Sequence, residues 1–351
     1  MPSNESSSNP NNRLISKKNI EKAGIVWAID KFSICKEKPG ELRQSPIFSS
    51  NTDDKIKWSL LMYPNGNEDK NKDYISLYLK WEEIDNIDVR AMWIFYVKNF
   101  EGEKKYIKFT NTTKFNGNEM LCGNSKFFKR DLLFKSDSKF LVNDTLILGC
   151  EIFYFCGLES NANTQTNNNG NEPLNTLTND FGRMLESAKF SDCVVKVGDS
   201  KIRAHKQILA SRSEVFDHIL TGKQHEPTPN VIEIDKFSPK AVKEMIKYLY
   251  TGNLPEMDEM ACEMLAIGDE YILNPLKSKA EESLINSLTK DNICDYLVKS
   301  EAHSAEILQK WCLRFIYLNP EITVNISEWD KVADVHPLLV GKLFMIFANI
   351  E

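Results

Sequence analysis

Residues 157–173, GLESNANTQTNNNGNEP, divide the 351-residue chain into two halves with different hydrophobic periods. Six asparagines fall within residues 161–171, and that stretch contains no large apolar side chain. A segment of this composition buries too little apolar surface to offset the entropy lost on ordering. We therefore expect an Asn-rich linker at 157–173. Residues 1–18 are similarly polar and predict a disordered N-terminus.

Ahead of the linker, apolar and polar residues alternate. In the stretch 74–81, we expect Ile75, Leu77, Leu79 and Trp81 to face inward, and Tyr74, Ser76, Tyr78 and Lys80 to face outward. Alternation also marks 55–60, and strong strand patterns occupy 89–97 and 145–155, with turn residues such as Asn65-Gly66 between them. Short strands of this kind, with no convincing amphipathic helix, favour an all-β antiparallel sandwich over residues 19–156.

After the linker, the period becomes that of α-helices. Ser238 and Pro239 have the character of an N-cap and a first helical residue, and Gly252 that of a C-cap. Further helical patterns continue to residue 350, and two short strands are predicted at 192–197 and 231–234. The second half is therefore expected to be α+β and mostly helical.

The composition argues against several classes of function. The formal net charge of −6 and a pI near 5.6 provide no basic surface for nucleic acid. No run reaches the roughly 18 apolar residues of a membrane helix. The polar N-terminus lacks the apolar region of a signal peptide, so we expect a protein of the nucleus or cytoplasm that is not secreted. The eight cysteines lack metal-ligand spacing, and no cofactor or metal is expected.

Catalytic motifs are likewise missing from the sequence. There is no phosphate-binding glycine loop, no Gly-x-Ser-x-Gly and no His-Glu-x-x-His. His205 lies near a predicted strand-to-helix junction, and we interpret it as a hydrogen-bonded structural residue. An enzyme is the least supported class of function.

Two features point to protein–protein interaction, and each has a plainer alternative. Tyr74 and Tyr78 share the outward parity of a strand, which suits a peptide groove but is also a common strand preference. Just past the linker, a helix carries the apolar residues Leu174, Leu177, Phe181, Met184 and Leu185. This stripe is expected to pack on a partner subunit or on its own domain.

The two halves resemble two known domain families in a known order. The first resembles a MATH (TRAF-like) domain through Trp27-Ala28-Ile29-Asp30-Lys31-Phe32, Tyr63-Pro64-Asn65-Gly66 and Lys126-Phe127-Phe128-Lys129-Arg130-Asp131. The second resembles a BTB/POZ domain through Phe190-Ser191-Asp192-Cys193, residues 204–216 (AHKQILASRSEVF) and residues 245–252 (MIKYLYTG). The resemblance implies a BTB/POZ domain at 174–287 and a C-terminal helical, BACK-like extension at 288–351.

The resemblance also implies a function. Proteins of this kind are substrate adaptors of cullin-3-type ubiquitin ligases. Their MATH domain holds a short peptide of the target, while their BTB domain forms a homodimer and docks the cullin. The implied residues are Tyr74, Tyr78 and Trp93 for the peptide groove, Leu177, Phe181, Met184 and Ile208 for the dimer interface, and Gln224 and Glu226 for the cullin contact. The resemblance further implies that the helical extension lengthens the cullin contact and supports higher oligomers.

Several positions depart from the family pattern. Gln224 stands where relatives carry a hydrophobic anchor for the cullin, so a self-associating scaffold that recruits no cullin remains the alternative. Trp93 shares the parity of Ala91 and Phe95, which favours the core over the groove. Cys122 and Asn124 replace two groove aromatics, so we expect a target motif different from the family's usual one.

Overall fold

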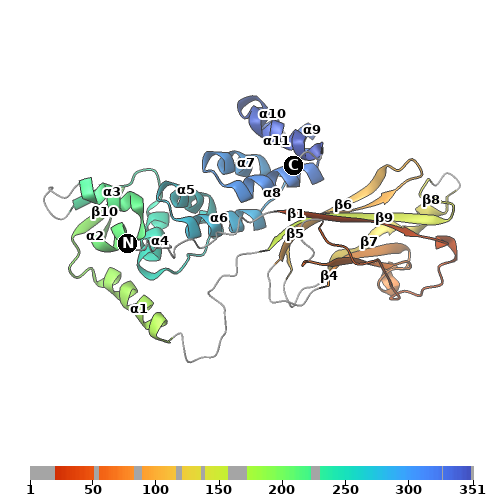
Figure 1. Ribbon diagram of the computed structural model, residues 1–351, viewed down its shortest axis with the longest axis horizontal. Helices are drawn as coiled ribbons and strands as arrows, with labels where there is room; N and C mark the ends of the chain where they lie inside the picture. Colours follow the sequence, from red (N-terminus) through yellow and green to blue (C-terminus); the bar gives the residue numbers. More distant parts are fainter. Residues whose placement is uncertain are drawn as a thin grey trace, which may run out of the picture.

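The computed structural model describes residues 20–50, 55–82, 89–115, 121–135, 139–156, 172–222, 230–325 and 327–348. Figure 1 shows a β-sandwich at one end, a mixed α/β part at the other, and the C-terminal helices between them. The predicted order, an antiparallel β domain followed by a mostly helical region, is confirmed. The predicted N-terminal segment 1–18 and the linker as far as residue 171 lie outside the described residues.

The sandwich half consists of two antiparallel sheets with the orders β1-β9-β5-β6 and β2-β3-β4-β7, and β8 also pairs with β9. The first sheet contains β1 (Glu21–Ile29), β5 (Val89–Lys98), β6 (Lys104–Phe115), β8 (Leu141–Val142) and β9 (Thr145–Cys156). The second contains β2 (Arg43–Gln44), β3 (Trp58–Tyr63), β4 (Tyr74–Trp81) and β7 (Leu121–Lys129).

The sandwich core lies where alternating residues of the two sheets meet. Trp58 of β3, Leu79 of β4 and Trp93 of β5 are all fully buried in it. The rings of Trp58 and Phe115 pack edge-to-face, with centroids 5.1 Å apart. The inward parity predicted for β4 is confirmed, so the opposite face of that strand is turned away from the core.

The second half starts with helix α1 (Glu172–Ser187) and a sheet of order β11-β10-β12. Strand β10 (Cys193–Val197) pairs antiparallel with β11 (Ser200–Ala204) and parallel with β12 (Asn230–Glu233). The following helices are α2 (Lys206–Arg212), α3 (Glu214–Gly222), α4 (Pro239–Thr251), α5 (Ala261–Glu270) and α6 (Asn274–Asn286). The C-terminal helices are α7 (Ile293–Ala302), α8 (Glu306–Leu318), α9 (Ile322–Asn325), α10 (Ser327–Val335) and α11 (Pro337–Phe347).

The termini of α4 follow the sequence closely. The Ser238 hydroxyl accepts a hydrogen bond from the Ala241 backbone N–H at 3.2 Å, which caps the N-terminus. Gly252 has a φ of 71° and ends the helix in the left-handed conformation that glycine adopts without strain. The strands predicted at 192–197 and 231–234 are present as β10 and β12, whereas β11 was not predicted because most of its residues are exposed and polar.

Candidate protein-interaction surfaces

The outer face of the sheet β2-β3-β4-β7 carries the tyrosines expected on the outward parity of β4. Tyr74 and Tyr78 are each half-buried on this face. The Tyr78 ring packs edge-to-face with Tyr63 of β3, with centroids 5.8 Å apart. The Lys126 ammonium lies 5.7 Å from the centroid of the Tyr74 ring. Rigid aromatic rings with polar tips beside a cation suit an extended peptide ligand.

Tyr78 occupies its position because the facing residue on β7 has no side chain. Gly123 is opposite Tyr78 in the pairing of β4 with β7. A Cβ atom at residue 123 would lie 2.5 Å from Tyr78 Cα and 2.8 Å from Tyr78 Cδ1. Sequence reasoning missed both Gly123 and Tyr63. A glycine inside a strand pattern is the signal that was available for the first.

The phenol of Tyr78 is held in its protonated form. Burial raises the pKa of Tyr78 above its ordinary value of 10, and the nearby Tyr63, Glu68 and Cys122 raise it further. The hydroxyl therefore remains neutral well above physiological pH and can donate a hydrogen bond to a ligand carbonyl or carboxylate.

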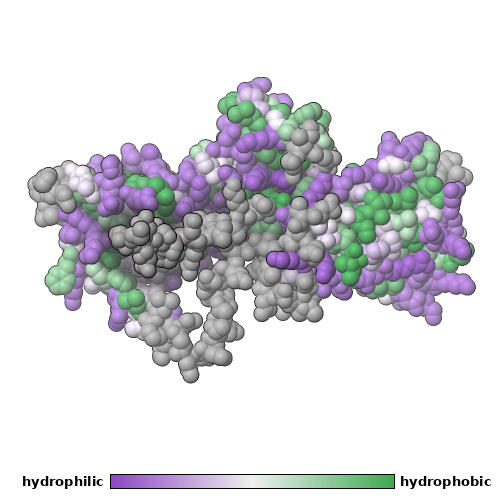
Figure 2. Space-filling model, in the orientation of Figure 1, coloured by the Kyte–Doolittle hydropathy of each residue, from purple (hydrophilic) through white to green (hydrophobic). Residues whose placement is uncertain are grey.

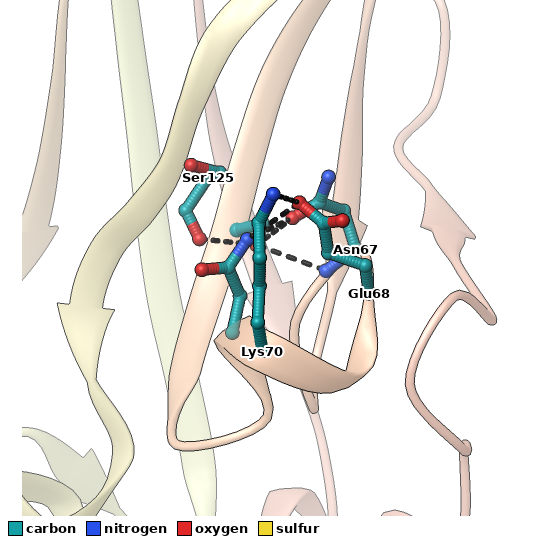
Figure 3. Close-up of polar contacts among 6 residues, drawn as sticks. Asn67, Glu68, Lys70 and Ser125 are labelled. Atoms are coloured by element: carbon teal, nitrogen blue, oxygen red, sulfur yellow. Dashed lines mark hydrogen bonds and ion pairs between the residues drawn. The ribbon is translucent and has the colours of Figure 1, made fainter.

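A polar network fixes the loop between β3 and β4 beside this surface (Figure 3). The Ser76 hydroxyl donates to the Ser125 carbonyl at 2.5 Å and accepts from the Asn67 backbone N–H at 3.1 Å. The Asn71 amide donates to Asn67 Oδ1 at 2.9 Å. Ser76 was expected on the exposed face of β4, but it is fully buried because these bonds hold the loop over it. The loop thus forms a fixed border of the tyrosine surface.

Strand β7 offers backbone groups as well as side chains. It stands at the end of its sheet order, so within the described residues only β4 pairs with it. An edge strand of this kind can accept an extended peptide as an additional strand. The surface formed by Tyr63, Tyr74, Tyr78, Gly123 and Lys126 adjoins that edge, and we call it the tyrosine surface.

Trp93 does not belong to the tyrosine surface, which corrects its assignment to the groove. Its side chain is fully buried and its ring lies 5.6 Å from Phe115 and 6.2 Å from Phe95, centroid to centroid. The pairing of β5 with β6 shifts register next to Trp93, but the pairing with β9 runs unbroken through it. The side chain therefore keeps the inward parity of its strand.

The residues implied for the dimer interface lie on α1 and α2. Phe181 of α1 and Ile208 of α2 are partly buried against the core of the same domain, and Met184 is half-buried. Leu177 is 51% exposed, and Phe190, just past α1, is 94% exposed. Hydrophobic residues are visible along α1 in Figure 2. Part of the stripe thus packs on its own domain, and part remains open to a partner.

The residues implied for the cullin contact belong to the segment between α3 and β12. Gln224 and Glu226 lie in 223–229, outside the described residues.

His205 is a structural residue, as predicted. Its backbone N–H donates to the Tyr250 hydroxyl at 2.8 Å, its Nδ1 lies 2.7 Å from that hydroxyl, and its Nε2 lies 2.7 Å from the Lys189 carbonyl. Burial raises the pKa of Tyr250 to about 12. Both ring nitrogens are engaged, so the ring joins α4 to the start of α2.

Other chemistry finds little support in the part of the chain that the structure describes. No group of three His, Cys, Asp or Glu side chains there is arranged to hold a metal ion. None of the helices seen is long and apolar enough to cross a membrane. Burial raises the pKa of the Cys193 thiol to about 12 and that of Cys150 well above its usual range. Such thiols are weak nucleophiles at neutral pH.

A contact between the two halves was not predicted. Strand β5 is buried on both faces: alternate residues from Val89 to Val97 enter the sandwich core, while Met92, Ile94 and Tyr96 join the apolar core of the helical half. Phe153 and Phe155 of β9 join the same side. We call this contact the seam. The sequence did contain a sign of the seam, because the residues of β5 that face away from the sandwich core are mostly apolar.

Aromatic and polar contacts complete the seam. Phe155 packs edge-to-face on Trp311 of α8 and Phe109 of β6 packs edge-to-face on Phe315, each with centroids 5.0 Å apart. The Trp311 indole N–H donates to the Thr112 hydroxyl at 2.9 Å.

A buried charge also crosses the seam. Arg90 of β5 is 6% exposed, and its guanidinium bonds to the Glu282 carboxylate and the Asn286 amide oxygen on α6.

Comparison with known proteins identifies both halves. Residues 24–152 match the family model of the MATH domain, and residues 181–288 match that of the BTB/POZ domain. Among solved structures, the chain is similar to the BTB domain of zebrafish PATZ1. The two are 22% identical, the match covers 32% of this chain and 88% of that one, and the TM-score is 0.27.

Proposed function

Since this chain is a MATH plus BTB/POZ domain protein, we propose that it is a substrate-recruiting adaptor of a cullin-3-type ubiquitin ligase. The MATH domain binds a short target peptide, and the BTB domain dimerises and docks the cullin. The observation that carries the proposal is the pairing, in one chain, of these two interaction domains. The tyrosine surface on β4 and β7 and the open apolar residues of α1 fit the two roles.

The target arm of the proposal is supported by the edge strand and its tyrosines. A peptide added to β7 gains main-chain hydrogen bonds from the strand, while Tyr63 and Tyr78 contribute rigid apolar area beside it. Gly123 leaves room for the Tyr78 ring to lie close against β7, next to that edge. Lys126, which is exposed, favours an acidic side chain in the peptide.

The dimer arm is supported by the exposure of apolar residues on and next to α1. Leu177 and Phe190 are apolar, yet they are open to solvent in the single chain. A partner subunit would bury them. Dimerisation would make target capture bivalent, which raises avidity without any new contact. The role places the protein in the nucleus or cytoplasm and demands no catalysis from the chain itself.

The cullin arm is tested by co-precipitation with the full-length chain. We expect a cullin-3-type scaffold to bind, and Glu226→Lys to abolish that binding. Gln224→Met should strengthen it by roughly 1–2 kcal/mol, because a buried apolar anchor replaces a polar side chain. Tyr78→Ala is the matched control on the other domain, and it should leave cullin binding unchanged.

One observation favours the alternative role, a self-associating scaffold that recruits no cullin. Gln224 stands at the position of the hydrophobic anchor, and Pro227 and Pro229 follow within five residues. If the unmodified chain dimerises but captures no cullin, while Gln224→Met does capture it, the scaffold role is the correct one.

A further inference from the structure

The aromatic part of the seam is packed like the interior of a domain. Phe155, Trp311 and Phe315 are each at most 2% exposed. Their edge-to-face geometry and the hydrogen bond from Trp311 to Thr112 leave no polar group of the indole unpaired. Contacts between independently moving domains are usually smaller and more polar. Close packing of this kind resists sliding, because each ring fits only one arrangement of its neighbours.

The outer face of the first sheet is too apolar to be exposed to water. Met92, Ile94 and Tyr96 of β5 and Phe153 of β9 would form a contiguous apolar patch on a free MATH domain. In the chain they are buried by the helical half.

Arg90 gives the seam its specificity. A buried guanidinium is costly unless it is paired, and both partners of Arg90, Glu282 and Asn286, belong to α6. Arg90 is 192 residues from Glu282 and 196 residues from Asn286 in sequence, so it reaches both only when the two halves are in register. The charge therefore selects one docked orientation among those that apolar contact alone would allow.

We propose that the MATH domain is docked on helices α6 and α8 of its own chain, through the seam, as one rigid body with the BTB half. The segment 157–171 then joins the halves without setting their separation. Under the proposed adaptor function, a dimer holds its two tyrosine surfaces at one fixed spacing and orientation. It favours targets that present two motifs at the matching distance, and it discriminates against other spacings.

The test is to cut the connection in the folded full-length protein. A specific protease site is inserted between Asn163 and Asn168, the purified protein is cleaved, and the two fragments are followed by gel filtration with light scattering. We expect the fragments to co-elute as a 1:1 complex after cleavage. Prompt separation of the fragments of the unmodified chain would overturn the proposal.

Charge reversal provides the internal control. Arg90→Glu should release most of the MATH fragment after cleavage, as should Glu282→Arg, and the double variant should restore most of the co-elution. Rescue by the double variant distinguishes docking from misfolding. The matched control is reversal of the exposed pair Lys196 and Glu233, 2.9 Å apart in the BTB sheet, which should leave co-elution unchanged. Equal retention of the MATH fragment in Arg90→Glu would contradict the role of this charge.

Dilution below the concentration at which the BTB half dimerises separates docking within a chain from docking between chains. A fragment complex that persists at that dilution supports docking within one chain, and one that requires the dimer overturns that part of the proposal. Co-elution needs neither target nor cullin. Its outcome is therefore independent of whether the adaptor function holds.

Discussion

The two sheets of the MATH sandwich have different outer faces. On β4 the outward residues include Tyr74, Tyr78 and Lys80, and none of these is fully buried. On β5 the corresponding residues between the charged Arg90 and Lys98 are Met92, Ile94 and Tyr96, and helices of the other half cover these three. In the same architecture, one outer face is thus left partly exposed and the other packs against its own chain.

This difference shows that the outward-facing residues of a strand indicate whether its outer face is covered. A strand that faces water on one side alternates apolar and polar residues, whereas one covered on both sides is apolar throughout. Strand β5, VRAMWIFYVK, is of the second kind from Val89 to Val97, and its buried charge, Arg90, has partners on α6. Its last residue, Lys98, is partly exposed. The apolar outer parity is therefore evidence of a cover, and the mixed parity of β4 is evidence of an available surface.

The largest effect should come from Trp93→Ala. If Trp93 lay on the tyrosine surface, its loss would mainly affect target binding. Because it fills the core between the sheets, we expect the free energy of unfolding of the MATH domain to fall by about 3–5 kcal/mol. Urea denaturation measures this loss. A change below about 1 kcal/mol would contradict the assignment of Trp93 to the core.

Phe155→Ala should have the next largest effect. Removing the ring leaves a cavity beside Trp311, and we expect a loss of about 3 kcal/mol in the stability of the docked chain. Thermal unfolding and the cleavage assay both detect it. Phe100→Ala is the matched control, since Phe100 is 55% exposed on the same sandwich and should change stability by less than about 0.5 kcal/mol.

Gly123→Ala tests the close approach of Tyr78 to β7. The new Cβ would lie 2.3 Å from the Leu77 carbonyl oxygen, so the strands must move apart. We expect a loss of about 1–3 kcal/mol together with weaker target capture. Gly341→Ala in α11 is the control. Among the described residues outside its own helix turn, none lies within 4 Å of the new Cβ, so stability should hold or rise. Unaltered stability in Gly123→Ala would show that the contact is loose.

Tyr78→Ala should change stability least and binding most. Loss of the edge-to-face pair with Tyr63 should cost about 1 kcal/mol. Target capture should fall by about tenfold or more, since an aromatic anchor is removed. Light scattering should show an unchanged dimer. Target binding equal to that of the parent chain would remove Tyr78 from the site.

Sequence patterns predicted the structure correctly where it depends on residues close together in the chain. The inward residues of β4, the caps of α4 and the structural role of His205 all follow from local spacing. Ser76 was misplaced because a loop from outside its strand covers it. Gly123 was missed because its role depends on the ring across from it, and pairing register is not visible in a single strand.

The seam was missed for a similar reason. The apolar outer parity of β5 predicts a cover but does not say which element supplies it. Arg90 and Glu282 are separated by 192 residues, and no local pattern links them. The boundaries predicted at 156, 174 and 287 remain predictions, and so do the roles of Gln224 and Glu226.

Burial of β5 on both sides also limits how this protein can be re-engineered or diversified. A MATH domain that is joined only by a linker can be exchanged for another MATH domain without changes in the rest of the chain. Here an exchanged domain would have to carry the same residues at positions 90, 92, 94, 153 and 155, or α6 and α8 would have to change with it. Under the proposed adaptor function, new target specificity is therefore easier to acquire by substitution on the tyrosine surface than by recombination of whole domains.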